Sequence, residues 1–375
     1  MRVLFTAAPI YGHVLPLLPL AEAAAEAGDE AAVAVPPSMA RLVGGLTVRP
    51  TGPEVDVLLK ENDRRTGGAD MSDMRDVFPV ASFFASTRVD LTFDETVAQA
   101  RGFGADVIVA DEYDAVGAMV AAALRVPLIQ HGIGLPVSPP PLEPAMQALL
   151  APRYAQRGLA GARRVALVDP WPPLLHAPRW SPPPDRLPIR ARAYAGTAAD
   201  MPVDLPPTKP GRARVLVTLG TVLLDTGMLD ALVDAVAALD DVEVLALVPP
   251  GCPRPLADIR NNVRFTGFVP MAQLLAAGVA AVVAAGGAGT VLAAMSHGIP
   301  MVLWPKGAEK PMNAERVAAV GAGLVVDEPG QAGEAVGKVL ADLSYGAAAA
   351  RVAEEIRHAP APAQVWSELR GRLQA

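Results

Sequence analysis

Residues 278–295 read GVAAVVAAGGAGTVLAAM, and this stretch decides how the rest of the chain is interpreted. An apolar run over residues 278–285 stops at a glycine-rich turn, residues 286–290, and helix-compatible residues follow at 291–295. A short apolar run that ends in clustered glycines before a helix is typical of a buried parallel strand. The amide groups and the dipole at the start of such a helix attract anions, and glycines let a phosphate approach the backbone. The stretch therefore predicts a binding site for a phosphorylated ligand.

Short apolar runs alternate with helical stretches along both halves of the chain. Strands are expected at residues 2–6, 31–35, 46–49, 107–110, 126–130 and 165–168 in the first half, and at 213–219, 242–248, 263–265 and 278–285 in the second. Helices are expected at 14–27 and 228–239, and the tail from residue 346 onwards is expected to be largely helical. Strand–helix–strand units imply right-handed crossovers and parallel strands. The expected fold class is therefore α/β, with two Rossmann-like domains that each hold a parallel sheet.

Two kinds of stretch are expected to interrupt this alternation. Residues 55–103 are polar by comparison and predict a solvated, irregular region near the ligand site. Proline-rich runs at residues 170–188 and 202–210 cannot continue a helix or a central strand. The boundary between the two domains is therefore expected near residue 205.

The segment from residue 262 to 317 resembles the donor-binding signature of nucleotide-sugar-dependent glycosyltransferases, in particular the bacterial enzymes that attach deoxysugars to polyketides and other natural products. The likeness lies in the turn Gly267-Phe268-Val269-Pro270, the glycine-rich turn and the stretch Gly307-Ala308-Glu309-Lys310-Pro311-Met312-Asn313, whose order and spacing match. It implies the GT-B fold, in which two Rossmann-like domains face each other across a cleft. Residues 1–205 would then bind the acceptor and residues 206–358 the nucleotide-sugar donor, while a helix in residues 359–375 would cross back to the first domain.

His13 is the predicted general base. Sugar transfer needs a group that deprotonates the acceptor hydroxyl, and a histidine suits this role near neutral pH. His13 follows the first strand, at the sheet edge where open α/β sheets bind ligands. The element Gly12-His13-Val14-Leu15-Pro16 matches the family's Gly-His-x-x-Pro, so the resemblance implies that His13 is the catalytic base. A capping or packing histidine is the alternative.

Asp111 is the predicted partner of His13, because it follows the strand at 107–110 and so lies at the same sheet edge. A carboxylate there would fix the tautomer of the imidazole and stabilise its protonated form. Glu112 and Asp114 compete for this role, and a solvated turn residue is the alternative for Asp111. The other four histidines carry weaker signals. A packing role is expected for His131 and His297, and lining the acceptor pocket is the alternative for His131. A surface position is expected for His176 and His358.

The resemblance also implies the donor contacts. A hydroxyl after the strand at 213–219 would approach the diphosphate, an aromatic ring beside a backbone contact would stack on the nucleobase, the glycine-rich turn would hold the diphosphate, and a polar pair would bind the sugar. The corresponding residues are Thr218, Gly220 and Thr221; Phe268 and Val269; Ala285, Gly286, Gly287, Ala288, Gly289 and Thr290; and Glu309 and Lys310. Core packing is the alternative for Phe268.

Several of these positions depart from the family pattern. Ala285 replaces the histidine before the glycine pair, which removes a donor to the leaving phosphate and costs about 3 kcal/mol in a preorganised site. The substitution Ala285→His is therefore expected to raise the rate. Ala293 stands where uridine-specific relatives carry a glutamate that binds the ribose hydroxyls, which favours a thymidine diphosphate (TDP) sugar. Lys310 replaces a glutamine and Glu309 an aspartate.

Composition argues against several other classes of protein. The 375-residue chain carries a net charge of −7 and no basic tract, which argues against nucleic acid as a partner. Cys252 is the only cysteine, so no intramolecular disulfide can form and a cytoplasmic location is expected. Neither a signal peptide nor an apolar window of about 20 residues is expected, which predicts no membrane span. No acidic cluster has metal-ligand spacing, so neither a metal nor a resident cofactor is expected.

The sequence thus predicts an inverting O-glycosyltransferase. It would move a deoxysugar from a TDP-sugar, or from a uridine diphosphate sugar, to a hydroxyl of a hydrophobic natural-product aglycone. Its expected partners are these two small molecules, and a homodimer is possible. Three alternatives stay open: a non-catalytic relative that binds a nucleotide or a partner enzyme, a nucleotide-sugar epimerase, and a C-glycosyltransferase on the same scaffold.

Overall fold

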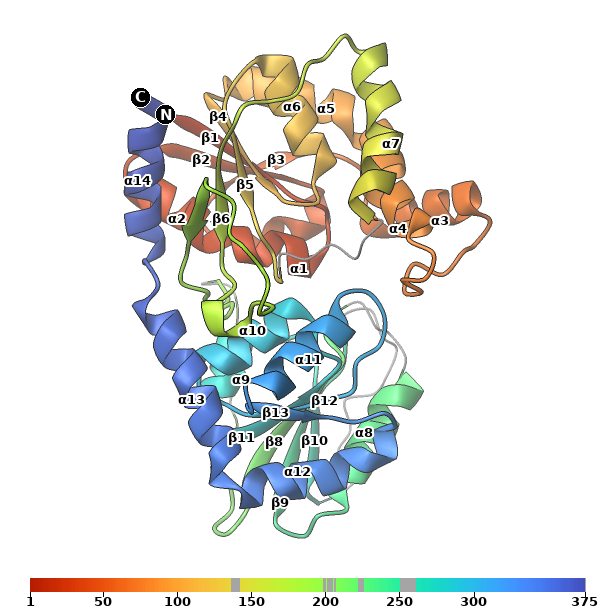
Figure 1. Ribbon diagram of the computed structural model, residues 1–375, viewed down its shortest axis with the longest axis vertical. Coiled ribbons are helices and arrows are strands. Elements are labelled where there is room, and N and C mark those ends of the chain that lie inside the picture. Colours follow the sequence, from red (N-terminus) through yellow and green to blue (C-terminus); the bar gives the residue numbers. More distant parts are fainter. Residues whose placement is uncertain are drawn as a thin grey trace.

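The computed structural model describes residues 1–135, 142–197, 200, 205, 207–221, 226–249 and 261–374. Within these residues the chain forms two parallel sheets, one in each half, with helices on their faces (Figure 1). Cys252 and residues 202–204 and 206 of the proline-rich run at 202–210 lie outside this description.

The first sheet has seven described strands in the order β3-β2-β1-β4-β5-β6-β7, all parallel. Its strands are β1 (Arg2–Thr6), β2 (Glu30–Val35), β3 (Thr47–Pro50), β4 (Val107–Asp111), β5 (Leu128–His131), β6 (Arg164–Asp169) and β7 (Arg186–Pro188). Its α-helices are α1 (Tyr11–Val14), α2 (Leu18–Glu26), α3 (Val55–Thr66), α4 (Phe78–Ser82), α5 (Arg88–Phe103), α6 (Ala115–Leu124) and α7 (Leu142–Gln156). Short 3₁₀ turns lie at Leu15–Leu17, Pro37–Leu42 and Pro173–Leu175, and a π-helical turn at Phe83–Thr87.

The second sheet has six described strands in the order β10-β9-β8-β11-β12-β13, again parallel. Its strands are β8 (Ala213–Thr218), β9 (Val242–Leu247), β10 (Val263–Thr266), β11 (Val279–Ala284), β12 (Met301–Leu303) and β13 (Gly323–Val325). The helices of this half are α8 (Thr226–Ala237), α9 (Met271–Ala276), α10 (Ala288–Ser296), α11 (Lys310–Ala319), α12 (Ala332–Ala341) and α13 (Leu343–His358), with a 3₁₀ turn at Pro329–Gln331. The last helix, α14 (Pro362–Gln374), belongs spatially to the first half.

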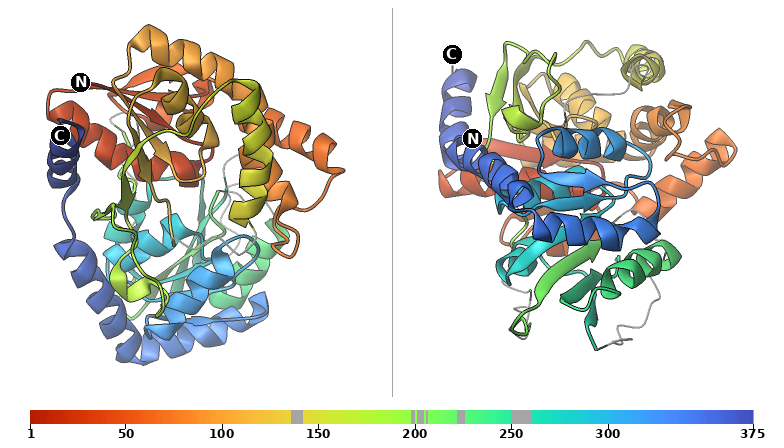
Figure 2. Two further views of the ribbon diagram at one scale, coloured as in Figure 1. Left: turned by 45° about the horizontal axis from the view of Figure 1, so that its top comes forward. Right: turned by 60° about the horizontal axis from the view of Figure 1, so that its bottom comes forward.

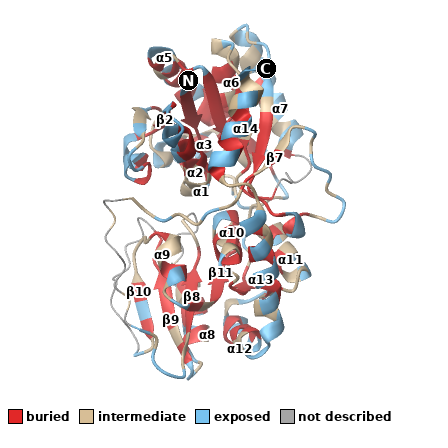
Figure 3. Ribbon diagram, turned by 90° about the vertical axis from the view of Figure 1, so that its left-hand side faces the viewer, coloured by how far each residue is buried: buried red, intermediate tan, exposed pale blue. Residues whose placement is uncertain are grey.

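The central strands of each sheet are largely apolar because helices cover both faces. In β1, Val3 and Phe5 pack in a cluster with α2 and α14, whereas Leu4 points to the opposite face and packs with α5 and α6. All three side chains are fully buried. Figure 3 shows the same pattern for the whole molecule, with buried residues along the strands and exposed ones on the outer helix surfaces.

Each sheet contains one point where the strand order reverses direction. In the first sheet this point lies between β1 and β4, and in the second between β8 and β11. The connections that leave two neighbouring strands there run to opposite sides of the sheet, so their carboxyl ends leave a crevice for ligands. Asp111 is the last residue of β4, and His13 lies in the segment after β1. Likewise, Thr218 is the last residue of β8, and Gly286 lies just after β11. The fold therefore brings the predicted site residues to these two points.

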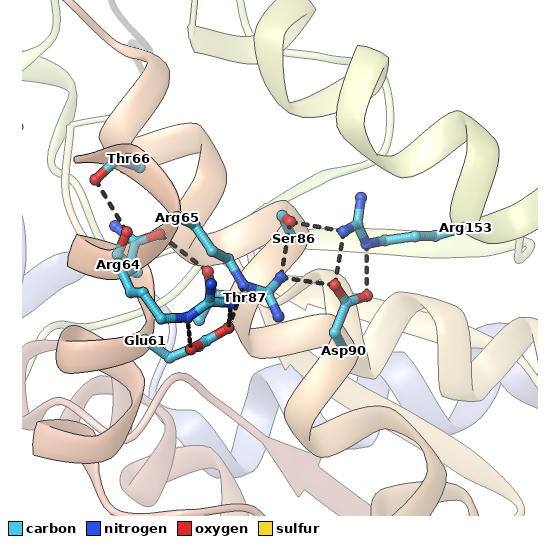
Figure 4. Close-up of polar contacts among 9 residues, drawn as sticks. Glu61, Arg64, Arg65, Thr66, Ser86, Thr87, Asp90 and Arg153 are labelled. Carbon is cyan, nitrogen blue, oxygen red and sulfur yellow. Dashed lines mark hydrogen bonds and ion pairs between the residues drawn. The ribbon is translucent and has the colours of Figure 1, made fainter.

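The stretch at residues 55–103, expected to be irregular, is largely helical, and this expectation was wrong. Its charged side chains pair with one another between helices instead of being solvated singly (Figure 4). Asp90 of α5 accepts from both Arg65 of α3 and Arg153 of α7, each at 2.7 Å, and the Ser86 hydroxyl accepts from the same two guanidinium groups. The network joins three helices around the π-helical turn.

The helix expected at residues 14–27 is divided into three parts. Pro16 lies at the start of the 3₁₀ turn that follows α1, and Pro19 lies in the first turn of α2. Proline has no amide hydrogen and is accepted only where a new helical segment begins. The strands and the cap at Gly28, which has a φ of +84°, agree with expectation.

The C-terminal helix α14 packs on α2 of the first half, and Figures 1 and 2 show it running back beside the start of the chain. Its Trp366 is fully buried in the first-half core and donates from Nε1 to Asp29 Oδ2 at 2.8 Å. The amino group of Met1 donates to the other oxygen of Asp29 at 2.7 Å. Both chain ends are therefore fixed to one carboxylate. Among the described residues, none forms a helix with the length and apolar character that crossing a bilayer needs.

We predict that Trp366→Ala destabilises the protein by about 3–5 kcal/mol, because the change leaves a large cavity and removes a buried hydrogen bond. Urea unfolding followed by intrinsic fluorescence and circular dichroism measures this. Ser367→Ala on the exposed side of α14 is the matched control and should change stability by less than about 0.5 kcal/mol. Equal effects of the two substitutions would show that α14 does not dock as described.

Candidate functional site

His13 and Asp111 form a buried pair at the strand reversal of the first sheet. The short helix α1 starts right after the loop that follows β1, and the His13 amide donates to Ile10 O at 2.9 Å. This places His13 Nδ1 3.2 Å from Asp111 Oδ1, at the end of β4. The imidazole keeps 11% of its surface exposed, while the carboxylate has none. The two residues predicted as a pair are thus brought into contact.

Asp111 is held by backbone donors as well as by His13. The amide of Ala8 donates to Oδ2 at 2.9 Å, and the amide of Tyr113 donates to Oδ1 at 2.8 Å. Burial alone would raise the pKa of Asp111, but the neighbouring His13 imidazole and these donors outweigh it and lower the pKa below its usual 3.8. The carboxylate is therefore ionised near neutral pH, and an ionised carboxylate can only accept. It follows that His13 Nδ1 carries the hydrogen, which leaves Nε2 as the basic nitrogen.

The two acids that competed with Asp111 in the sequence have other contacts. Asp114 forms a buried ion pair with Arg88 at 3.0 Å, and Arg88 also donates to Ala7 O at 2.6 Å. Glu112 points away from His13 and accepts from the amide of Ile133 at 3.2 Å. Asp111 is thus the carboxylate in contact with His13.

Aromatic side chains flank the imidazole of His13. The ring of Phe84 lies 5.2 Å from it and that of Tyr113 6.2 Å, measured between ring centroids. Phe84 belongs to the π-helical turn, a type of turn that often occurs at functional sites. Phe84 and Tyr113 also join an apolar cluster with Ile10 and Met146. No pattern in the sequence points to Phe84, because its stretch of the chain predicts an irregular region.

The other histidines lie outside the pair. His131 is buried, binds Gly132 O at 2.6 Å through Nδ1, and burial lowers its pKa to about 4. His176 was expected on the surface but is buried, because it stacks on Trp180 at 3.6 Å and approaches Asp169 at 3.4 Å. His297, expected to pack mid-helix, is exposed just after α10. His358 is on the surface, as expected.

The glycine-rich turn connects β11 to α10 in the second half. Gly286 has a φ of +86°, a conformation that suits glycine, and its carbonyl accepts from the buried Asn313 side chain at 2.9 Å. Gly287 caps α10, and the amide of Thr290 turns back to Gly287 O at 3.0 Å. Within the described part of the chain, no acceptor is found for the amides of Ala288 and Gly289. These two amides, with the dipole of α10, can bind an anion.

Ala285 itself is directed into the core. Its side chain is only 2% exposed and packs in the apolar cluster that contains Val302 and Trp304. A histidine at this position would have to displace these neighbours, and overpacking of this kind is destabilising. The rate gain expected from Ala285→His therefore lacks a structural basis.

The end of β8 lies beside the glycine-rich turn. Thr218 pairs with Ala284 in the register of the two central strands. The Thr218 hydroxyl accepts from the amide of Gly220 at 3.0 Å, and Gly220 has a φ of +80°. Thr221 follows, partly exposed, and residues 222–225 lie outside the description. The turn is thus placed at the strand reversal of the second sheet.

Glu309 and Lys310 mark the start of α11. Glu309 caps the helix, and its carbonyl accepts from the backbone amide of Asn313 at 3.0 Å. The side chains of Glu309 and Lys310 are partly exposed. The preceding turn contacts the first half, because the amide of Ala308 donates to Ser72 O at 3.4 Å. A Cβ added at Gly307 would lie only 2.6 Å from Ser72 Cβ.

Phe268 and Val269 lie where the two halves of the chain meet. The ring of Phe268 packs edge-on against Tyr11 at 5.0 Å and lies 6.0 Å from the Arg41 guanidinium, while Val269 packs on the second-half core. Arg41 also contacts the hydroxyl of Tyr11. Stacking of Phe268 on a nucleobase stays a prediction. Its contact with the first half was not foreseen, since no local pattern marks Tyr11 or Arg41.

The chain is similar to known proteins in both sequence and fold. Residues 230–371 match the family described as erythromycin biosynthesis protein CIII-like, C-terminal domain. The elloramycin glycosyltransferase ElmGT of Streptomyces olivaceus is 32% identical over 391 residues, which cover 98% of this chain and 97% of that protein. This chain belongs to the bacterial natural-product glycosyltransferases. It is a glycosyltransferase with the GT-B fold, so the non-catalytic and epimerase alternatives are not supported.

Two solved structures of such glycosyltransferases agree over the whole chain. SsfS6 of Streptomyces sp. SF2575, complexed with thymidine diphosphate, gives a TM-score of 0.82 at 28% identity and covers 99% of both chains. The spinosyn rhamnosyltransferase SpnG, complexed with spinosyn aglycone, gives a TM-score of 0.82 at 27% identity, with 99% of this chain and 100% of that chain covered.

We predict that Asp111→Asn destabilises this glycosyltransferase by about 1–3 kcal/mol at pH 7, because an amide cannot satisfy three donors that face a carboxylate. The pKa of Asp111 is lower in the folded than in the unfolded protein, so the carboxylate stabilises the fold above its usual pKa and loses this effect as the pH falls. The stability difference between wild type and variant should therefore shrink below about pH 4. Urea unfolding at pH 7 and 3.5 measures it, with Asp94→Asn on the exposed side of α5 as control. A difference that does not change with pH would contradict a lowered pKa.

Proposed function

We propose that this enzyme transfers a deoxysugar from a TDP-sugar to a hydroxyl group of a hydrophobic natural-product aglycone, with inversion at the anomeric carbon. The contact between His13 Nδ1 and Asp111 Oδ1 at 3.2 Å carries this proposal, because it provides a base at the strand reversal of the first sheet. The free amides at the start of α10 provide an anion site at the reversal of the second sheet.

His13 acts as the general base in the proposed reaction. Its Nδ1 hydrogen is held by Asp111, so Nε2 takes the proton from the acceptor hydroxyl as that oxygen attacks the anomeric carbon. Asp111, kept ionised by its backbone donors, stabilises the imidazolium that forms. Attack from the side opposite an α-linked diphosphate gives a β-linked product.

The diphosphate leaves toward the start of α10. The bond between the anomeric carbon and the phosphate oxygen breaks with both electrons on that oxygen, so negative charge grows on the diphosphate. The amides of Ala288 and Gly289 and the helix dipole stabilise this charge. Lys310 and Glu309 are proposed to bind the sugar, and Phe268 and Val269 the nucleobase.

The preference for TDP rests on two observations. SsfS6, which is similar over 99% of this chain, was crystallised with thymidine diphosphate. Ala293 of α10, which is buried in the second-half core, stands where the resemblance implies a glutamate that binds the ribose 2′-hydroxyl, and TDP has no such hydroxyl. A sugar-donor nucleotide without the 2′-hydroxyl therefore loses no hydrogen bond when alanine replaces glutamate at this position.

The acceptor is proposed to be apolar because the surroundings of His13 are apolar. Phe84 and Tyr113 flank the imidazole, and Ile10, Met71 and Met146 complete the cluster. SpnG, a spinosyn rhamnosyltransferase, was solved in complex with spinosyn aglycone, and ElmGT is an elloramycin glycosyltransferase. A polyketide-like aglycone is therefore the class proposed here.

His13→Gln should lower kcat by a factor of about 10²–10⁴, because the variant lacks the base. Affinity for TDP, measured by titration calorimetry, should stay within about threefold, since the diphosphate is bound in the other half. Product formation from a panel of TDP-deoxysugars and polyketide aglycones is measured by liquid chromatography. His358→Gln on the surface is the matched control. Unchanged turnover of His13→Gln would rule out its role as base.

TDP should bind the enzyme more tightly than uridine diphosphate does. Titration calorimetry of both nucleotides with the wild type measures the two dissociation constants. Tighter binding of uridine diphosphate to the wild type would refute the proposed donor class.

A further inference from the structure

Glu112 follows Asp111 directly but serves a different contact. Its side chain leaves the pair and lies beside the segment after β5, where Oε1 accepts from the Ile133 amide at 3.2 Å. A Cβ added at Gly132 would lie 3.7 Å from the same oxygen. The carboxyl group therefore binds the segment 132–135 at one backbone position, the amide of Ile133.

This segment touches the second half at the start of α10. Gly134 is buried, and a Cβ added there would lie 2.5 Å from the Cβ of Ala288. The next residue, Leu135, is 5% exposed and belongs to the second-half core cluster that includes Ala288 and Val291. A first-half loop thus packs directly on the residue whose amide opens the proposed phosphate site.

The charges around Glu112 favour its neutral form. Burial raises its pKa to about 8, against the effect of the Ile133 amide, and the carboxylates of Asp169 and Asp111 raise it further. The nearby His131 does not offset them, because burial keeps its pKa at about 4. At neutral pH Glu112 is mostly an uncharged acceptor.

We propose that Glu112 is a positioning residue for sugar transfer. By binding the Ile133 amide, it keeps Gly134 packed against Ala288 and so fixes the position of the His13–Asp111 pair relative to the start of α10. The inference rests on the proposed function. It assigns no chemical step to Glu112, whose effect is exerted through the 132–135 segment. Small displacements between a base and a reacting centre are enough to cost large factors in rate.

The first test compares Glu112→Ala with Glu112→Gln. The glutamine keeps an oxygen acceptor of the same shape, so its kcat should stay within about threefold of wild type, while the alanine should lower kcat at least about tenfold. Rates are expressed per TDP-binding site, counted by calorimetry, so that unfolded protein does not contribute. TDP affinity should change less than about threefold in both variants, because α10 and its amides belong to the second half.

Matched controls separate this effect from a general loss of stability. Glu95→Ala removes another first-half carboxylate that accepts from a loop amide, that of Gly52 at 2.7 Å, and should leave kcat unchanged. Gly134→Ala should lower kcat, because the new methyl group meets Ala288, whereas Gly161→Ala, with no atom within 4 Å of the new group, should not.

Hydrogen exchange gives a readout that needs no acceptor. TDP should slow exchange of the amides at residues 133–135 in the wild type and in Glu112→Gln, but much less in Glu112→Ala. If TDP binds the wild type and transfer occurs, yet Glu112→Ala matches wild type in kcat and exchange, the positioning role is overturned while the proposed function stands. If the wild type fails to bind TDP, the proposed function fails first.

The pH dependence of stability tests the state of the carboxyl group. The pKa of Glu112 is higher in the folded protein than its usual 4.5, so its contribution to stability is lost as the pH rises toward about 8. Glu112→Gln removes this titration, so its melting temperature relative to wild type should rise between pH 5 and 8. Asp169, Asp111 and His131 are present in both proteins and cancel in the comparison. A melting-temperature difference between Glu112→Gln and wild type that stays the same from pH 5 to pH 8 would show that Glu112 is not an uncharged acceptor.

Discussion

A fully buried carboxylate has to be matched by donors, and the first half of the chain is arranged around this requirement at Asp111. Its two oxygens accept from the amide of Ala8 after β1, from the amide of Tyr113 after β4, and from the imidazole of His13. The same contacts that offset the cost of burial fix the histidine in one tautomer. The same contacts therefore stabilise the local fold and orient the proposed base, and they come from two strands that are neighbours only because the sheet order reverses between them.

The two halves meet through a small number of specific contacts near the proposed site. Phe268 packs on Tyr11, two residues before His13, and Gly134 packs on Ala288. The turn before α11 reaches Ser72 in the connection between α3 and α4. Each of these three segments thus has its own first-half partner, so a shift of one half against the other would change the proposed nucleobase, phosphate and sugar sites together.

Periodicity predicted the strands well, because parallel strands covered on both faces are uninterrupted apolar runs such as residues 107–110 and 279–284. The resemblance led to His13 and Asp111, which the structure brings together. Long-range contacts were out of reach: Asp90 pairs with two arginines from other helices, and this pairing turns a polar stretch expected to be irregular into packed helices. His176 in its proline-rich loop gave no sign of stacking on Trp180, and nothing local indicated that Ala285 faces the core.

The return of α14 to the first half has a consequence for how the protein is made. Trp366 fills the core of a domain whose last strand, β7, ends at Pro188, well over a hundred residues earlier in the chain, and Asp29 lacks this hydrogen-bond donor until α14 has been synthesised. Domains usually fold in order as they leave the ribosome. The apolar face of α2 that α14 covers therefore stays exposed until α14, which follows the second half in the chain, has been synthesised. The second half thus has the chance to fold before α14 packs onto the first.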